Sequence, residues 1–322
     1  GLMDRNGKLL LPVKFSKLDP VENYLFIAAE KSKTNSLFVG KNYLYNSKGE
    51  SVVNDGFDLI YPAANGYLMI KSGEKWGYMN SSGAVIAPAI YDSIRNIKRD
   101  GTAAFRVKGK WGILDGKGKV LIKPIYDSIG EGDGTLYEEM QADENWFLVR
   151  SGDRYGLLST TGEVIARTDY AMIGSGKSGY FPAFKEIGKE ANLPVNGLTL
   201  LDSKGWELFT PKKEYNYMGE EGEGLLPAGR FAGYGRGKIM GYINHQGESV
   251  ISMQYEEAGK FSGGYAIVKS NGFYGVIDKK GKEVEQFIYD DISRSASYPG
   301  LFEGSLAGKK VYFEPGGNHY WK

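Results

Sequence analysis

Two stretches of the chain share one pattern: KWGYMNSSGAVIAPAIYDSI at residues 75–94 and KWGILDGKGKVLIKPIYDSI at residues 110–129. In both, apolar residues lead into a short polar residue, two further polar residues and a glycine, and a second apolar run follows. This order is typical of a β-hairpin whose type I turn ends in a left-handed residue, a conformation that glycine adopts without steric cost. The two stretches therefore predict strands joined by tight turns.

The same pattern returns along the whole chain, with 34 to 44 residues between successive closing glycines. A recurrence of this length indicates a tandem repeat. Its units start near residues 1, 43, 77, 112, 156, 199, 241 and 275, with a partial unit near 311. We predict about eight antiparallel repeats of three to four strands, forming one domain over residues 1–322.

Two further positions recur in each unit. The first turn residue is short and polar, so its side chain can accept hydrogen bonds from backbone amides two residues on. In seven of the eight units it is Asp or Asn, namely Asp4, Asn46, Asn80, Asp115, Asp202, Asn244 and Asp278. An aromatic residue follows the closing glycine by eight positions, or by ten in the sixth unit; it is Phe15, Phe57, Tyr91, Tyr126, Tyr170, Tyr215, Tyr255 or Tyr289. We expect these rings to pack between successive units, with the tyrosine hydroxyls bound to backbone groups.

With Trp-Gly before the turn and Tyr-Asp after it, these units resemble the bacterial WG-repeat (KWG-repeat) family. Tyr155, Met240 and Tyr274 replace the tryptophan in three units, and the sixth unit has lost both Trp and Gly. The resemblance implies an all-β bacterial repeat protein without catalytic residues, often exported or surface-associated. We therefore expect an extracytoplasmic or cell-surface location with the export signal removed, and a cytoplasmic location is the alternative.

Small antiparallel sheets in tandem can close radially or stack in an open array. We favour a β-propeller-like arrangement, and an open β-superhelical or solenoid array is the alternative. Trp76 and Trp111 are expected in the repeat core, each before a glycine that allows a neighbouring backbone to approach closely.

Composition excludes some partners. The 40 Lys and Arg residues balance 39 Asp and Glu residues to a net charge of +1, which gives no electrostatic reason to expect nucleic acid. Cysteine is absent, so disulfides and thiolate chemistry are excluded. No apolar run reaches the ~20 residues of a membrane-spanning helix.

AMIGSGKSGYF at residues 171–181 matches a loose P-loop pattern over 171–178. A P-loop works where a strand runs into it and a helix leaves it. Here Pro182 and a β-rich run follow, and the loops at 219–224 and 259–264 stand at the same position of later units. We therefore expect no nucleotide binding, and we expect Lys177 to be a solvated loop residue.

Other chemistry has little support in the sequence. The chain has two histidines, His245 and His319, so His-based triads and multi-histidine metal sites are not expected. The acidic stretch at 131–139 lacks the alternating ligands of a calcium loop. We predict no catalytic residues, no metal and no cofactor. A carboxylate-dependent hydrolase in the central depression of a closed propeller is the alternative.

Insertions near residues 130–145, 186–197 and 228–238 lengthen three units, and repeat proteins vary the loops that contact partners. We predict a noncatalytic binding or scaffold module that contacts a protein or a glycan of unknown identity through a charged edge. The candidate contact residues are Glu131, Asp133, Glu138, Glu139, Lys189, Arg230, Tyr234, Arg236 and Lys238.

Overall fold

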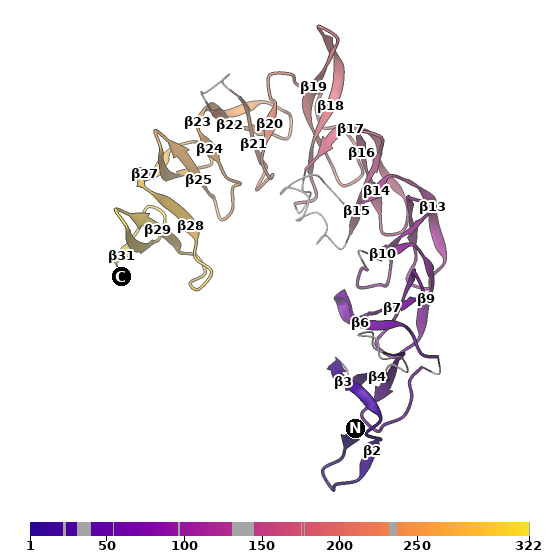
Figure 1. Cartoon of the computed structure of the whole chain (residues 1–322). Coiled ribbons are helices and arrows are strands. Elements are labelled where there is room, and N and C mark those ends of the chain that lie inside the picture. The colour runs from indigo at the N-terminus through magenta and orange to yellow at the C-terminus, as the bar shows by residue number, and fades with distance from the viewer. Residues whose placement is uncertain are drawn as a thin grey trace. The chain divides into compact units, whose positions relative to one another are not determined.

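The computed structural model describes residues 1–21, 24–30, 40–53, 55–95, 97–130, 145–174, 176, 178–231 and 237–321. These residues form eight sheets, in which hydrogen-bonded neighbours follow one another in chain order (Figure 1). The one helical element in this part of the chain is the short 3-10 helix η1 (Ala64–Gly66). None of its helices is long and apolar enough to cross a membrane. The predicted all-β architecture of small antiparallel meanders is confirmed.

Contacts between Cα atoms divide the described chain into two compact units. The first contains residues 1–130, 145–151 and 158–163, and the second contains residues 152–157 and 164–321. The single domain over residues 1–322 stays a prediction.

Four sheets precede residue 128. Their strands are β1 (Leu2–Met3) and β2 (Leu9–Leu11); β3 (Phe15–Val21), β4 (Leu25–Glu30) and β5 (Asn42–Asn46); β6 (Leu59–Pro62), β7 (Leu68–Ser72), β8 (Lys75–Met79) and β9 (Val85–Tyr91); and β10 (Ser93–Arg95), β11 (Ala103–Val107), β12 (Lys110–Leu114) and β13 (Val120–Tyr126).

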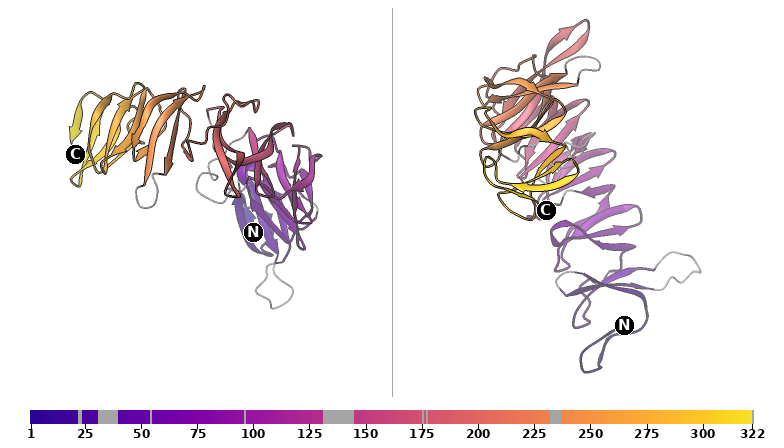
Figure 2. Two further views of the ribbon diagram at one scale, coloured as in Figure 1. Left: turned by 90° about the horizontal axis from the view of Figure 1, so that it is seen from above. Right: turned by 90° about the vertical axis from the view of Figure 1, so that its left-hand side faces the viewer.

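A six-stranded sheet comes next, and three four-stranded sheets complete the chain (Figure 2). Their strands are β14 (Ser128–Ile129), β15 (Trp146–Ser151), β16 (Arg154–Ser159), β17 (Val164–Ile173), β18 (Phe181–Glu190) and β19 (Leu193–Leu201); β20 (Tyr217–Met218), β21 (Leu225–Phe231), β22 (Lys238–Asn244) and β23 (Ser249–Tyr255); β24 (Glu257–Ala258), β25 (Tyr265–Ser270), β26 (Phe273–Asp278) and β27 (Glu283–Tyr289); and β28 (Asp291–Arg294), β29 (Phe302–Leu306), β30 (Lys309–Phe313) and β31 (His319–Trp321).

A typical sheet has four strands, which we call a, b, c and d in chain order. In β10–β13 the a strand is short, the c strand carries Trp-Gly, and the d strand ends at Tyr126. The next a strand starts two residues later, at Ser128. The physical sheets are therefore offset from the sequence units, which begin in the c strand. Such a meander is also the topology of a propeller blade.

The c–d turns have the predicted structure. Asp115 Oδ1 accepts hydrogen bonds from the backbone N–H groups of Lys117 and Lys119 at 2.9 and 2.8 Å, and Gly118 is left-handed with φ +80°. The same pair of bonds is made by Asp4, Asn46, Asn80, Asp202, Asn244 and Asp278.

Glycine follows tryptophan in the c strand because the d strand bulges over it. Trp111 pairs with Tyr126 and Ile113 pairs with Ile122, so Gly112 alone opposes three residues of the d strand. A Cβ at Gly112 would overlap the carbonyl oxygen of Ile122. The predicted close approach of backbone is confirmed here.

The repeat aromatics lie between successive sheets, as predicted. Tyr91 is buried and packs on Phe105 of the following sheet, with ring centroids 4.9 Å apart, and Tyr289 packs on Phe313 at 5.1 Å. The prediction that their hydroxyl groups bind backbone is wrong for Tyr170. Its hydroxyl donates to the carboxylate of Glu207 at 2.9 Å.

A different set of tyrosines makes hydroxyl bonds to the backbone. Tyr78, which follows Trp-Gly in β8, donates to the carbonyl of Gly101 at 2.6 Å, and Tyr242 of β22 donates to the carbonyl of Gly259 at 2.8 Å. Burial raises the pKa of both hydroxyls well above the usual tyrosine value. Each bond joins a c strand to the sheet that follows, and sequence spacing alone does not reveal it.

The residue after the repeat aromatic also links consecutive sheets. Asp58 accepts hydrogen bonds from Lys41 Nζ in β5's sheet and from the backbone N–H of Gly73 in the next b–c turn, both at 2.6 Å. Asn216 and Glu256 make the same kind of bond to backbone N–H groups of the b–c hairpins that follow them. At Asp58, Asn216 and Glu256 this position therefore anchors the following b–c hairpin to the preceding sheet.

The six-stranded sheet departs from this arrangement at β17. Ala171 occupies the position at which the other units have a polar residue, and β17 continues without interruption from a d strand into the next a strand. Arg154, in the place of the repeat lysine, instead forms an ion pair with Glu186 of β18.

Candidate binding surface

The three insertions occur at two different places in the repeat. Residues 131–144 separate β14 from β15, which are a and b strands, whereas 186–197 and 228–238 lie at b–c hairpins. The two places are at opposite ends of a b strand. Residues 131–144 lie outside the described part of the chain, so the prediction of one charged recognition edge stays a prediction.

Residues 186–197 form a two-stranded ribbon with a shift of register between Glu186 and Gly188. The register runs from Glu186 opposite Asn196 to Glu190 opposite Leu193. Ala191 and Asn192 close it with φ +49° and +64°, the conformation of a type I′ turn. The ribbon extends β18 and β19 beyond the neighbouring strands (Figure 1).

The distal part of this ribbon is exposed on both strands. Ile187 and Leu193 expose 43% and 69% of their surface, and Lys189 is exposed between them. Two large apolar side chains in water at the end of a ribbon add little to folding, which makes them candidates for contact with a partner.

The end of the β21–β22 hairpin carries an aromatic and cationic group. Phe231 pairs with Lys238 across the ladder and exposes 57% of its surface. Its ring meets Tyr217 edge-on at 6.2 Å, and Lys238 Nζ lies 4.0 Å from the centroid of Tyr217. The backbone N–H of Phe231 is fixed by Asn216 Oδ1 at 2.9 Å. The hairpin therefore holds these side chains at a defined place.

The next b–c turn adds a further aromatic residue. Asn271 and Gly272 are left-handed with φ +52° and +83°, and Glu256 accepts the Gly272 N–H at 3.1 Å. Phe273, which follows this turn, exposes 45% of its surface. Three consecutive b–c hairpins of the second unit thus present large apolar side chains.

We call this surface the hairpin edge. It is made up of Ile187, Lys189, Leu193, Arg230, Phe231, Lys238 and Phe273. Of the predicted contact residues it contains Lys189, Arg230 and Lys238. The others, Glu131, Asp133, Glu138, Glu139, Tyr234 and Arg236, lie outside the described residues.

Acidic and basic side chains on and near the hairpin edge differ in whether they have an ion-pair partner. The carboxylates nearby are engaged, Glu186 by Arg154 and Glu190 by Lys213 at 3.3 Å. Lys189, Arg230 and Lys238 have no carboxylate partner in the described part of the chain. The edge therefore combines exposed apolar groups with open positive charge.

A strand follows the P-loop-like segment at the place where a P-loop would continue into a helix. The N–H of Gly174 donates to the carbonyl of Pro182 at 2.7 Å, as Gly219 does to Pro227 at 2.8 Å. The predicted equivalence of these a–b loops is confirmed. Strand β18 follows at Phe181, so no helix N-terminus faces the loop. Lys177 lies outside the described residues.

The acidic loop at 219–224 is used in contacts between sheets. Glu220 receives Lys260 Nζ at 2.8 Å, and Glu223 accepts the N–H of Gly264 at 3.0 Å. Lys279 Nζ donates to the backbone carbonyl of Glu223 at 2.6 Å. These carboxylates stabilise the stacking of the a–b loops and are not open to a partner.

Both histidines pair with buried glutamates, a pairing that residue spacing does not predict. His245 Nε2 lies 3.0 Å from Glu221 Oε1, and His319 Nε2 lies 3.2 Å from Glu285 Oε2. The residues that the structure describes contain no group of three or more His, Asp or Glu side chains suited to a metal ion. The histidines therefore act as structural partners.

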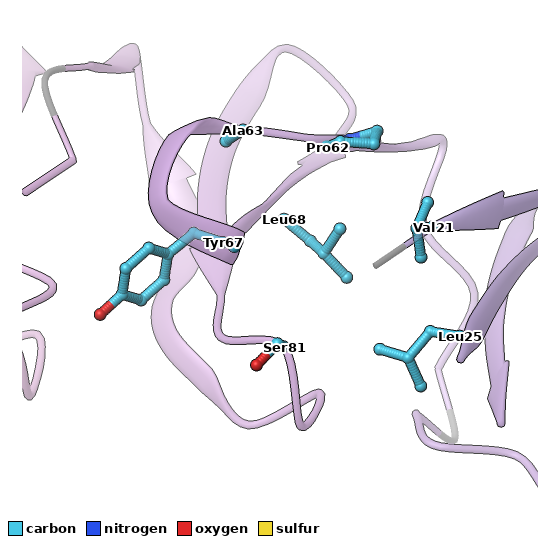
Figure 3. Close-up of a pocket in the computed structure, with 8 residues that line it drawn as sticks. Val21, Leu25, Pro62, Ala63, Tyr67, Leu68 and Ser81 are labelled. Atoms are coloured by element: carbon cyan, nitrogen blue, oxygen red, sulfur yellow. The ribbon is translucent and has the colours of Figure 1, made fainter. Parts of the chain in front are cut away.

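An apolar cavity lies in the first unit between the sheets β3–β5 and β6–β9. Figure 3 shows Val21, Leu25 and Leu68 directed toward one another within it. Ser81 adds one hydroxyl to the lining, and Tyr67 points its own hydroxyl away. Ligand sites usually combine apolar walls with several convergent polar groups. This cavity lacks such a set, so we favour the hairpin edge as the functional surface.

These features define an all-β tandem-repeat protein with propeller-like four-stranded sheets. The model of a family described as WG containing repeat matches residues 76–111, 111–131, 240–272 and 274–297. The chain therefore carries WG repeats at these four places. No curated protein matches it.

Solved structures with a similar arrangement have low sequence identity to the chain. A eukaryotic initiation factor is 9% identical at a TM-score of 0.42, covering 97% of this chain and 88% of its own. Hsv2p of Kluyveromyces lactis is 11% identical at 0.37, covering 77% and 89%. The β-propeller domain of the Trilobed protease from Pyrococcus furiosus, described as having an open velcro topology, is 11% identical at 0.34, covering 96% and 98%.

Proposed function

We propose that the chain is a noncatalytic binding module that contacts another macromolecule through the hairpin edge of its second unit. The observation that carries this proposal is the exposure of Leu193 and Phe231, at 69% and 57%, on hairpins longer than the fold needs. A b–c turn elsewhere, at Lys108 and Gly109, joins its strands directly.

The residues that define the repeat already have structural partners. This supports the proposal that they stabilise the fold and that other residues bind the partner. The turn aspartates bind backbone, the repeat tyrosines pack between sheets, and Asp58 anchors a hairpin. The side chains of the hairpin edge have few such roles, so they can vary without loss of the fold. Interfaces are typically enriched in aromatic residues and arginine, and Phe231 and Arg230 fit that composition.

Trimming the hairpins tests the proposal. Replacing residues 189–194 by Asn-Gly joins Gly188 to Val195, a cross-strand pair two steps from the native closing pair of Glu190 and Leu193. This change is combined with Phe231→Ser. The immobilised variant and the original chain are then compared as baits for proteins and glycans from extracts.

The control carries Val250→Ser and Ile288→Ser, which remove apolar side chains that are 43% and 41% exposed from d strands of the same unit. Circular dichroism checks that all variants fold. We expect the trimmed chain to lose its specific partner and the control to keep it. Retention of every partner by the folded, trimmed chain would refute the proposal.

A further inference from the structure

We propose that the hairpin edge binds an acidic polypeptide segment that also carries apolar side chains. This inference rests on the proposed function and specifies the chemical class of its partner. The first argument is charge. Lys189 and Arg230 are exposed, Lys238 lies over the Tyr217 ring, and none of the three has a carboxylate partner among the described residues, whereas Glu186 and Glu190 are held in ion pairs. A partner bearing carboxylates would supply the missing counter-charges.

Hydrogen-bonding capacity leads to the same class of partner. Lysine and arginine side chains donate and cannot accept. A neutral glycan presents hydroxyl groups that donate as well as accept, and the cationic side chains of the hairpin edge can serve only the accepting side of those groups. A carboxylate ligand accepts only, so it matches a surface whose open groups are donors.

The apolar groups distinguish a polypeptide from an acidic polysaccharide. Ile187 and Leu193 are aliphatic, and Phe231 presents an exposed ring whose edge contact with Tyr217 holds it in place. Burying such side chains requires apolar groups on the partner, which leucine or phenylalanine provides. Alternating acidic and apolar residues would meet both kinds of group on the edge.

Fluorescence anisotropy with defined probes tests this inference on the whole chain. The probe is a labelled peptide of alternating glutamate and leucine. Peptides with glutamine or lysine in place of glutamate serve as comparisons, and hyaluronate serves as an acidic polysaccharide. We expect the glutamate peptide to bind most tightly and its affinity to fall with added salt.

Charge reversal locates the binding. The test variant carries Lys189→Glu, Arg230→Glu and Lys238→Glu. The control carries Lys204→Glu, Lys280→Glu and Lys282→Glu, which change the net charge equally at c–d turns of the same unit. We expect the test variant to bind the glutamate peptide at least about tenfold more weakly and the control to bind within about twofold of the original chain.

Several outcomes overturn the inference. These are equal weakening by both variants, tighter binding of the lysine or glutamine peptide, or competition by hyaluronate with no peptide binding. A cellular partner that is lost on hairpin trimming but unaffected by charge reversal refutes the acidic class and leaves the proposed function standing. A partner that survives trimming refutes the proposed function itself.

Discussion

Lys75 Nζ lies 2.5 Å from Asp92 Oδ1, and this contact joins the c strand of one sheet to the link that leads into the next. The other carboxylate oxygen accepts the backbone N–H of Lys108, in the following b–c turn, at 2.7 Å. One aspartate thus holds two sheets and a hairpin together, which explains why Lys-Trp-Gly and Tyr-Asp occur in the same repeat unit.

Asp92→Asn should destabilise the first unit at neutral pH and much less in acid. Lys75 first, and the Lys108 N–H second, lower the pKa of the Asp92 carboxyl below its usual value. A depressed pKa contributes stability above the unfolded aspartate value, ~3.9, and that contribution is lost as pH falls through the folded pKa. Urea unfolding at pH 7 and pH 3 measures the difference from the original chain.

The control for this experiment is Glu74→Gln, since Glu74 is 95% exposed near the same turns. It should change the unfolding midpoint little at either pH. A deficit of Asp92→Asn that is the same at pH 3 as at pH 7 would show that the ionised carboxylate does not stabilise the junction.

Gly118→Ala should lower the free energy of unfolding by more than the left-handed backbone conformation at this position explains. Gly118 has φ +80°, and its Cβ would overlap the carbonyl oxygen of Ile86 in the preceding sheet. Gly109 has φ +81° in the same sheet with open space around it, so Gly109→Ala isolates the backbone term of about 1 kcal/mol.

We expect Gly118→Ala to lose a further ~1–3 kcal/mol of unfolding free energy through overpacking. Denaturant titration of both variants gives the comparison. Equal losses would mean that the closing glycine serves only the turn and not the stacking of sheets.

Ala191→Gly should stabilise the ribbon. Alanine at φ +49° carries a left-handed penalty that glycine avoids, so we expect a gain of up to about 1 kcal/mol in local opening free energy. Amide hydrogen exchange of the ribbon residues provides the measurement. Asn192→Gly is the matched comparison. It should raise the local opening free energy by less, because asparagine tolerates this conformation. Unchanged or faster exchange in Ala191→Gly would contradict the assigned turn.

Much of the repeat scaffold could be predicted because its determinants are local. Asp115 and Gly118 lie within one turn, and Gly112 carries the signature of a close backbone approach. The boundary between one sheet and the next was harder to predict from the sequence. Tyr126 ends one sheet and Ser128 begins another, yet sequence similarity divides the repeat at the c strand, since a cyclic pattern has no intrinsic starting point.

The candidate surface could be predicted only in part. Charge in the insertions pointed to Lys189, Arg230 and Lys238, but Ala191-Asn192 lacks the usual Asn-Gly signal of a two-residue hairpin, so the ribbon was expected as a loop. The pairing of His245 with Glu221 joins residues 24 positions apart. Such a contact forms where two loops of the folded chain meet. The spacing of residues along the sequence does not predict which loops these are.

Site-specific photocrosslinking tests the central claim most directly. A benzophenone amino acid is placed at Leu193 or Phe231 on the hairpin edge, and at Lys204 or Lys280 on exposed c–d turns of the same unit. Irradiation of the folded chain with its captured partner should give covalent adducts from positions 193 and 231 and none from positions 204 and 280. Adducts that form only at positions 204 and 280, or equally at all four, would contradict the claim that the hairpin edge is the binding surface.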